Sequence, residues 1–337
     1  MHTRSPLLLR SGVLTSSFVA LCLATAASAD DFTYSNSGTT WNTAAAWTPS
    51  GVPTGGNTYI VSNGHVLRTD ATTGSTFGGG TLSLLGQLNL QSTTTGVNAT
   101  HTANIVTSAG SLIVNARSTT THTLAGTMQL GTGSTFLKSS GTNATTGDKR
   151  NITFTTLISG GTGATAHFLR NGDFTLSNAG NTFAGTWRAG GSASMVVDGV
   201  TATVSNSSDV ISTIKATTAG SLGINTSVTL DAWSRFDADF DWTTTGALTL
   251  ANNAGNASSI IVTLDQDITV GLLSIAGTTL TAGEYDYADL VSAGFGDYFT
   301  NGIGSITVGT IPEPSTYAAL LGLASLALAT RASRRKS

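Results

Sequence analysis

Cysteine is almost absent from this chain of 337 residues, which contains a single one, Cys22. Cys22 lies inside an apolar N-terminal segment, so the sequence that follows contains no thiol. This excludes three things from the remainder of the chain: a small scaffold held by disulfides, a thiolate metal centre and a cysteine nucleophile.

Charge is also scarce, because charged residues make up 10% of the chain, against about a quarter in an average globular domain. Acidic residues outnumber basic ones, and residues 30 to 310 carry nine positive and seventeen negative side chains. Nucleic acid is therefore a poor candidate partner, since its binding depends on clustered lysine and arginine.

A helical hydrophobic period is missing between the two ends of the chain, where glycine, threonine, serine, alanine and asparagine dominate. Regularly spaced leucine, isoleucine, valine and phenylalanine argue against disorder. The pattern instead predicts an all-β protein of short strands separated by turns. Expected strands include Gly80 to Leu84, Gln87 to Leu90, Ser111 to Val114, Asn151 to Phe154, Ser194 to Val197, Val200 to Val204, Ala247 to Leu250 and Ile303 to Val308.

Strands of about four residues do not form a stable sheet alone, but stacked coils share one continuous core. We therefore expect a parallel β-helix, or β-solenoid, over residues 30 to 310, with a β-sandwich as the alternative fold. At about 20 to 25 residues per coil, this length gives on the order of eleven to fourteen coils.

The N-terminus has the pattern of a secretory signal peptide over residues 1 to 29. Arg4 and Arg10 precede an apolar segment, and Ala27-Ser28-Ala29 supplies small residues before Asp30. Cleavage is expected between Ala29 and Asp30, with export through the Sec pathway.

The C-terminus, residues 311 to 337, has three parts in a fixed order. The first part is Pro312-Glu313-Pro314, in which the two prolines are expected to keep the peptide around Glu313 extended and accessible. The segment from Tyr317 to Ala329 is apolar and uncharged, which suits a short transmembrane helix. A basic cluster then favours a cytoplasmic C-terminus; it consists of Arg331, Arg334, Arg335 and Lys336.

These three parts closely resemble the PEP-CTERM sorting signal of Gram-negative bacteria. The resemblance implies processing by exosortase, a membrane-embedded enzyme that resembles cysteine transpeptidases, with transient anchoring in the inner membrane. An ordinary C-terminal tail anchor is the alternative interpretation of the same residues.

A tryptophan-rich segment opens the exported part, and we expect it to form a cap over residues 30 to 73. It resembles the opening of secreted bacterial β-helix proteins, in which two tryptophans precede a Gly-x-Pro segment. Trp41 and Trp47 are expected to cover the end of the core. Stacking of these rings on sugars is the functional alternative.

A second resemblance lies in the middle of the chain, between Phe174 and Gly190. Its Asn181-Thr182-Phe183 and Gly185-Thr186 are similar to the centre of the autotransporter-associated β-strand repeat, whereas Asn178 and Trp187-Arg188 depart from that pattern. A weaker resemblance, to the closing coil of such cargo proteins, covers Leu280 to Leu290 and Phe299 to Val308.

Candidate chemistry is sparse. His101 and His122 are 21 positions apart, about one coil, so they could stack on one face. Asp237, Asp239 and Asp241 alternate with other residues, so a strand would put all three on one face. We interpret them as solvated side chains, with a weak calcium site and a catalytic acid cluster as alternatives. Glu284, Asp286 and Asp289 form a similar, weaker group.

The sequence as a whole predicts a structural or adhesive protein of the cell surface or extracellular matrix, without enzymatic activity or cofactor. Expected partners are exosortase, the inner membrane and matrix components such as exopolysaccharide. Two alternatives come from other classes: a β-helix polysaccharide lyase or hydrolase that uses the three aspartates, and a carbohydrate-binding adhesin that uses Trp41, Trp47, Trp187 or Trp242.

Overall fold

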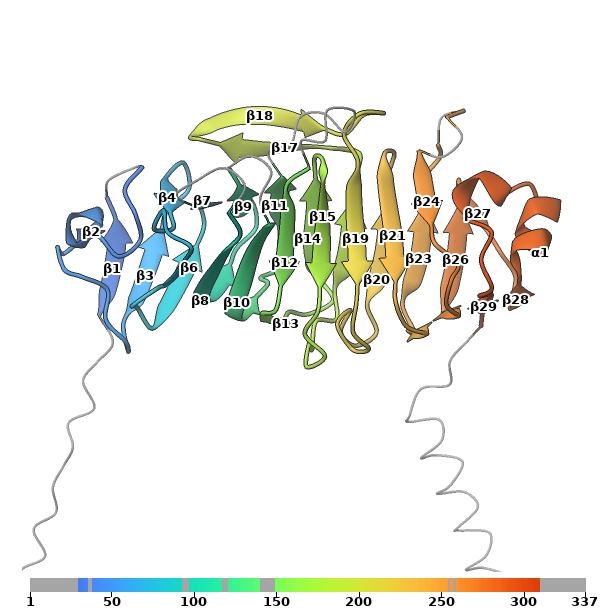
Figure 1. Cartoon of the computed structure of the whole chain (residues 1–337), viewed down its shortest axis with the longest axis horizontal. Coiled ribbons are helices and arrows are strands. Elements are labelled where there is room, and N and C mark those ends of the chain that lie inside the picture. Colours follow the sequence, from blue (N-terminus) through green and yellow to red (C-terminus); the bar gives the residue numbers. More distant parts are fainter. Residues whose placement is uncertain are drawn as a thin grey trace, which may run out of the picture.

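The computed structural model describes residues 30–35, 38–92, 97–116, 121–139, 149–253, 255–256 and 259–309. Figure 1 shows these residues as a long stack of short strands that runs from the N-terminal to the C-terminal end of the described chain. The predicted signal peptide and the predicted C-terminal signal lie outside the described residues.

One long sheet, here called sheet A, has 13 strands and forms one side of the stack. Its strands are β1 (Asp31–Tyr34), β2 (Trp47–Thr48), β3 (Thr58–Val61), β5 (Gly74–Thr76), β6 (Thr81–Leu84), β8 (Ala99–Thr107), β10 (Thr121–Gln129), β12 (Asn151–Phe154), β13 (Leu157–Ser159), β15 (Gly172–Leu176), β19 (Ser212–Ala216), β21 (Ser234–Ala238) and β24 (Ile260–Val262).

A second long sheet, sheet B, has ten strands. They are β4 (Val66–Arg68), β7 (Gln87–Leu90), β9 (Leu112–Asn115), β11 (Gly133–Ser139), β14 (Ala164–Leu169), β16 (Thr186–Ala189), β20 (Ser227–Leu230), β23 (Ala247–Leu250), β26 (Leu272–Ile275) and β27 (Thr278–Thr279).

Two smaller sheets complete the described strands. A two-stranded sheet contains β17 (Ser192–Val197) and β18 (Val200–Ser205). A four-stranded sheet contains β22 (Trp242–Thr243), β25 (Ile268–Val270), β28 (Gly283–Tyr285) and β29 (Ile306–Val308).

The chain coils, because it visits sheet A and sheet B in turn and each return lies parallel to the preceding one. In sheet B, for example, Leu67, Leu88, Ile113 and Leu137 are successive partners in register. The expectation of an all-β chain with parallel strands is thereby confirmed, and this pairing differs from the antiparallel pairing of a β-sandwich.

The described coils are fewer than the eleven to fourteen that we expected. Sheet B has ten strands, of which β27 pairs antiparallel with β26, so nine parallel strands remain. Insertions account for the difference. Arg188 and Thr229 are partners in neighbouring coils, yet 41 positions separate them because β17 and β18 are inserted between.

The space between the sheets is filled by one continuous apolar core. Along each strand, alternate side chains point inward, as in β20, where Val228 and Leu230 are fully buried while Ser227 and Thr229 are only partly covered. Stacked coils therefore bury their apolar residues against the coils before and after them, which no single four-residue strand could do alone.

The Asn-Thr-Phe segment that resembles the autotransporter-associated repeat forms the turn between β15 and β16. The Asn181 side chain accepts a hydrogen bond from Ile158 N (2.7 Å) and donates one to Ser221 O (2.6 Å), so it links the coils on both sides. Phe183 and Trp187 are buried against each other, with ring centroids 4.4 Å apart. These contacts give the motif a structural role in holding a turn.

The N-terminal end of the stack is closed by aromatic side chains, as predicted for Trp41 and Trp47. Both indoles are buried, and Trp47 packs edge-on against Tyr34 and Tyr59 with centroids 5.5 and 4.9 Å apart. Phe77 joins the same cluster. A short 3-10 helix, η1 (Ala44–Ala46), leads into β2, which pairs antiparallel with β1 and so covers the first strand.

The C-terminal end is closed by a helix that the sequence analysis did not predict. The helix α1 (Tyr287–Ser292) starts at a capping box, in which Asp286 and Asp289 each accept a hydrogen bond from the backbone N–H of the other. Together with the 3-10 helix η2 (Gly296–Tyr298), it places Leu290, Tyr298 and Phe299 on the end of the core. Within the described residues, no helix is long and apolar enough to cross a membrane.

Candidate functional site

The two histidines predicted to stack do so, inside the stack rather than on its surface. His101 in β8 and His122 in β10 are fully buried, with ring centroids 5.2 Å apart and a distance of 3.1 Å between His101 Nε2 and His122 Nδ1. His101 Nδ1 lies 3.1 Å from Ser75 Oγ. His122 Nε2 has no hydrogen-bond partner among the described residues.

These contacts select a proton arrangement. If His101 donates from Nδ1 to Ser75 Oγ, its Nε2 accepts the proton of His122 Nδ1, and only a lone pair on His122 Nε2 stays unpaired. The opposite arrangement would bury an unpaired N–H, which is costlier. Burial lowers the pKa of His101 and of His122 to about 4, and for His122 the repulsion from a protonated His101 adds to this effect. Both rings are therefore neutral at pH 7.

The histidine pair does not make a metal centre. Among the described residues, no group of three or more histidine, cysteine, aspartate or glutamate side chains is placed to hold a metal ion. The pair is instead surrounded by hydroxyl groups and by Trp41, whose ring packs edge-on against His101 with centroids 5.9 Å apart. The histidine pair is therefore a buried polar element of the core near the N-terminal end of the stack.

The three alternating aspartates do not share one strand face, contrary to our expectation. Strand β21 ends at Ala238, so Asp237 lies on the strand, Asp239 follows its end and Asp241 lies before β22. The backbone bends at Asp239 and Phe240, and the buried Trp242 packs against Phe236 with ring centroids 5.4 Å apart. The weak calcium site considered for these residues is therefore not assembled in the described part of the chain.

Each aspartate has a different local environment. Burial raises the pKa of Asp237, an effect that the neighbouring Lys215 opposes and the charges of Asp239, Asp265 and Asp173 reinforce. Asp241 Oδ1 accepts a hydrogen bond from Asp267 N (3.1 Å), and Asp267 Oδ1 accepts one from Ser305 N (2.9 Å). These last carboxylates thus form a column that links successive coils.

The weaker acidic group at the C-terminal end also has local partners. Asp286 and Asp289 form the capping box of α1, and Glu284 Oε1 accepts a hydrogen bond from Ser305 Oγ (3.1 Å). Their carboxylates are therefore engaged in holding the end of the stack together.

The tryptophans considered for sugar stacking are not on the surface. Trp41, Trp47, Trp187 and Trp242 are all buried, with at most 3% of the side-chain surface exposed. Their ring faces are covered by protein, and Trp187 Nε1 donates to Leu222 O (2.8 Å). The adhesin alternative based on these four rings is therefore wrong in this fold.

The largest feature that the sequence analysis missed is the antiparallel hairpin of β17 and β18. The two segments were predicted as separate strands, but Asp198 and Gly199 join them in a tight turn, both at positive φ. An Asp-Gly pair between two alternating apolar segments is the signal that predicts such a turn. Figure 1 shows the hairpin lying along the stack, across strands of several coils.

The hairpin covers an apolar patch on the outer face of sheet B. Met195 and Val204 pack there against Leu112, Val114, Phe136 and Leu169 in a second, smaller core. The tip is held by a pair of hydrogen bonds, since Gln87 Nε2 donates to Asp198 Oδ1 (3.0 Å) and Asp198 N donates to Gln87 Oε1 (2.8 Å). Residues 111 positions apart are thereby joined.

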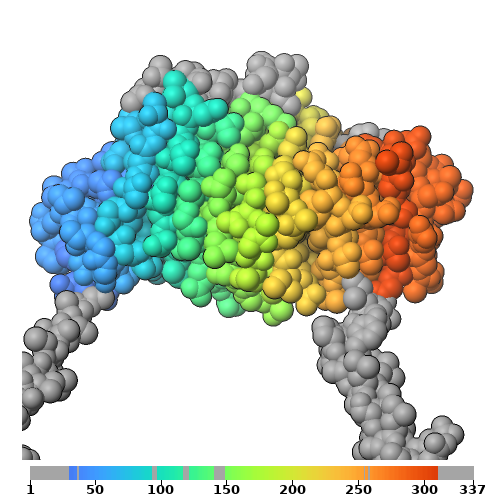
Figure 2. Space-filling view, turned by 60° about the horizontal axis from the view of Figure 1, so that its bottom comes forward, coloured from blue at the N-terminus to red at the C-terminus, as the bar shows by residue number. Residues whose placement is uncertain are grey.

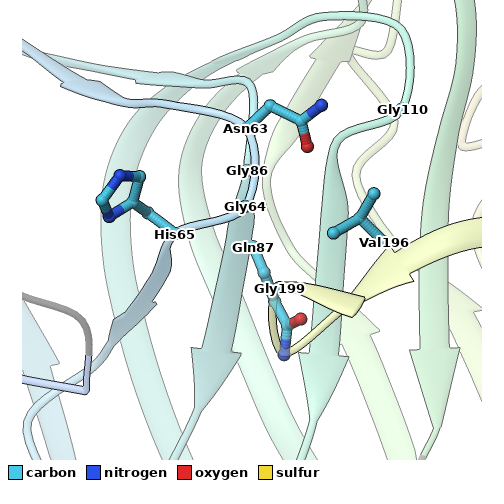
Figure 3. Close-up of a pocket in the computed structure, with 8 residues that line it drawn as sticks. All are labelled: Asn63, Gly64, His65, Gly86, Gln87, Gly110, Val196 and Gly199. Atoms are coloured by element: carbon cyan, nitrogen blue, oxygen red, sulfur yellow. The ribbon is translucent and has the colours of Figure 1, made fainter. Parts of the chain in front are cut away.

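Two clefts border this hairpin. The one at its tip is narrow and is lined by Asn63, Gly64, His65, Gly86, Gln87, Gly110, Val196 and Gly199. Figure 3 shows the Gln87 side chain reaching toward the turn at Gly199. The neighbouring cleft has a volume of about 210 Å³, and Leu85, Phe136 and Met195 give it an apolar wall.

A third, shallow groove of about 420 Å³ lies on the outer face of sheet A. Asn104 and Thr127 occupy neighbouring strands there, and Thr127 Oγ1 donates to Asn104 Oδ1 (3.0 Å). Gln129, Leu157 and Ser159 complete its floor. In the space-filling view of Figure 2 the described part of the molecule is an elongated body.

Comparison with known proteins finds one similarity. The PEP-CTERM protein-sorting motif matches residues 310–336, which confirms the position of the signal predicted from Pro312, Glu313, Pro314 and the basic cluster. No curated protein and no solved structure matches the chain. The motif begins two residues after the last strand of the stack, which ends at Val308. The chain therefore carries a PEP-CTERM sorting motif, which indicates export and sorting by exosortase to the cell envelope or surface.

Proposed function

We propose that this chain is a nonenzymatic structural or adhesive protein of the cell surface or extracellular matrix, whose exported part is a parallel β-helix. Exosortase recognises the tail of the precursor and cuts it near Pro312 to Ser315. The signal peptide directs export through the Sec pathway, and the apolar segment from Tyr317 to Ala329 is a temporary anchor.

The observation that carries this proposal is the place of the motif relative to the fold. The stack closes with β29 at Val308, and the motif starts at residue 310. A cut within the motif would leave the whole stack, both capped ends included, as an intact product. Because proline disfavours helix at the residue before it, the sequence Pro-Glu-Pro favours a segment that a protease can reach.

The exterior supports a structural role. The outer faces of the strands carry threonine, serine and asparagine, and such side chains bond between coils, as Thr127 does with Asn104. In a turn, the Asn178 side chain likewise donates to Thr155 O (2.8 Å). The acidic side chains that could imitate a lyase site are spread over two elements or used in caps. A long body with repeated polar rungs suits a spacer or matrix component.

The test uses the full chain in its producing cell, with an antibody against the exported part. In Glu313→Ala, or in a strain without exosortase, we expect an uncut precursor in the membrane fraction and loss of the released form. The matched control is Glu284→Gln: Glu284 and Glu313 are the two glutamates of the chain, and glutamine keeps a side-chain oxygen to accept from Ser305 Oγ. Equal processing of Glu313→Ala and the wild type would contradict the proposal.

A further inference from the structure

The outer edge of the hairpin is open. Among the described strands, β18 pairs with β17 alone, and its other edge has no partner strand. Figure 1 shows β18 at the outer margin of the molecule, with β17 between it and the stack. Val200, Thr201, Thr203 and Ser205 are exposed on this strand. A strand with an unpaired edge offers its N–H and C=O groups to another strand.

This edge lacks the features that usually prevent such pairing. The segment from Val200 to Ser205 contains no charge and no proline. By contrast, each long sheet ends in a two-residue antiparallel strand at one end, β2 or β27. At the other end, Thr40 bridges Arg68 of β4 and Phe299 bridges Val262 of β24. Strand β18 is therefore the described sheet edge best suited to binding a further strand.

We propose that β18 pairs antiparallel with β18 of a second copy of this chain, across a two-fold axis, and so joins two hairpins into a four-stranded sheet. A two-fold axis perpendicular to the sheet keeps the inner faces of both hairpins on the same side. Residues of the same face must then lie opposite each other, which restricts the register.

In one register, each residue of the central segment lies opposite a residue of its own type. It places Val200 opposite Val204 of the second copy, Thr201 opposite Thr203, and Ala202 opposite its own equivalent. Val200 is 67% exposed in the single chain, so this pairing gives it an apolar partner. Cross-strand threonine pairs and β-branched pairs are favourable in antiparallel sheets.

Charge at the two ends of the strand also fits this register. The exposed Asp198 at the hairpin tip falls opposite Asn206 of the second copy, beside Ser205. Arg170 Nη1 donates to Ser205 O (3.5 Å), so a guanidinium stands at that end of the strand. The two-fold axis therefore brings Asp198 of each copy toward Arg170 of the other copy. The segment between these ends is uncharged, so the pairing places no like charges opposite each other.

This inference does not depend on the proposed sorting or matrix role, because it concerns the exported body alone. Its test measures the molar mass of the exported protein by size-exclusion chromatography with light scattering, over a range of concentrations. The wild type is expected to reach the mass of a dimer.

Two charge variants test the register. T201K/T203K sets lysines opposite each other across the axis, and we expect it to weaken the dimer about tenfold or more, since directly opposed like charges destabilise a sheet pair. T201K/T203E sets a lysine opposite a glutamate on both sides and should remain dimeric. T127K/Q129K adds the same charges at exposed positions of β10 and serves as the control.

A cysteine provides a second readout. Ala202→Cys lies on the proposed axis, so two copies should form a disulfide under oxidising conditions, because paired strand positions have the Cα separation that a disulfide requires. The single native cysteine, Cys22, lies in the predicted signal peptide, so the exported protein has no other thiol that could form a disulfide. A wild type that is monomeric at every concentration, or an Ala202→Cys variant that does not cross-link, overturns the proposal and leaves this edge to a strand from another protein.

Discussion

Polar side chains in the described part of this protein bond between coils. Asn181 links the coils on either side of it, the exposed Asp241 accepts a hydrogen bond from Asp267 N, and His101 contacts His122 one coil away. Asn181, His101 and His122 are buried, so their contacts satisfy polar groups that burial would otherwise penalise. At the scale of single residues, then, polar side chains align the stack, and their loss is expected to affect stability.

The histidine pair makes stability depend on pH. The pKa of His101 and of His122 is lowered to about 4 in the folded protein, from 6.5 in the unfolded chain, mainly by burial. As pH falls below 6.5, the unfolded chain binds protons at these sites and the folded protein does not. The free energy of unfolding should therefore decrease between pH 6.5 and 4, by on the order of 3 kcal/mol for each histidine at most.

Urea unfolding between pH 7 and 5 measures this decrease. His122→Gln should flatten the dependence in part, since it removes one of three buried histidines, His101, His122 and His167, whose pKa burial lowers. A wild type whose free energy of unfolding is constant over this range would show that the two rings are not buried in the way described.

The three aspartates give a second prediction at this scale. Replacing Asp237, Asp239 and Asp241 with asparagine keeps a side-chain oxygen to accept from Asp267 N, and it removes a partly buried charge at Asp237. We expect the melting temperature to change by no more than about 2 to 4 °C, or about 1 kcal/mol. Calcium should not alter the melting temperature of the wild type, because a ligand stabilises only a state that binds it.

The outcome that contradicts this prediction is a calcium-dependent rise in the wild-type melting temperature that the triple variant abolishes. Such a result would mean that the three side chains, although on different elements, converge on an ion.

At the scale of elements, short strands could be predicted because their patterns are local. Gln87 to Leu90, Asn151 to Phe154 and Ala247 to Leu250 agree with β7, β12 and β23 residue for residue. Each has alternating or continuous apolar residues bounded by turn residues. Tertiary packing in these segments favours the same strand that the local pattern predicts.

Where prediction failed, the pattern did not show where a strand ends or what it packs against. The alternation of Asp237, Asp239 and Asp241 continues past Ala238, where β21 ends and the backbone bends. The hairpin of β17 and β18 is stabilised by sheet B residues such as Gln87, which lie over a hundred positions away. The pattern of residues within one segment predicts neither of these features.

The turn at Gly86 leaves no room for a side chain. A Cβ atom there would collide with the backbone carbonyl oxygens of Ser62 and His65, which are fixed in the preceding coil. Gly86→Ala should therefore lower the free energy of unfolding by roughly 1 to 3 kcal/mol or more, as overpacking does. Chemical unfolding measures it.

The matched control is Gly55→Ala. A Cβ at Gly55 meets no atom within 4 Å, and its φ is not in the left-handed region. Its stability should be unchanged or slightly increased, since alanine restricts the unfolded chain more than glycine does. Equal loss in both variants would show that the coils at Gly86 are not packed as described.

At the scale of the whole molecule, the ends of the stack matter most. The aromatic cluster around Trp47 closes one end and α1 with η2 closes the other, so the described coils do not present an open end to a further coil. A body closed in this way can be released intact when its tail is removed. We therefore predict that the folded stack stays intact when the tail is removed.

The most direct test of this claim is mass spectrometry of the C-terminal peptide of the abundant exported form, from envelope and extracellular fractions. We predict a peptide that ends between Pro312 and Ser315, within the matched motif, and lacks the apolar segment that follows. If the abundant form still carries the segment from Tyr317 to Ala329, the tail is a permanent anchor, and the proposed processing by exosortase is wrong.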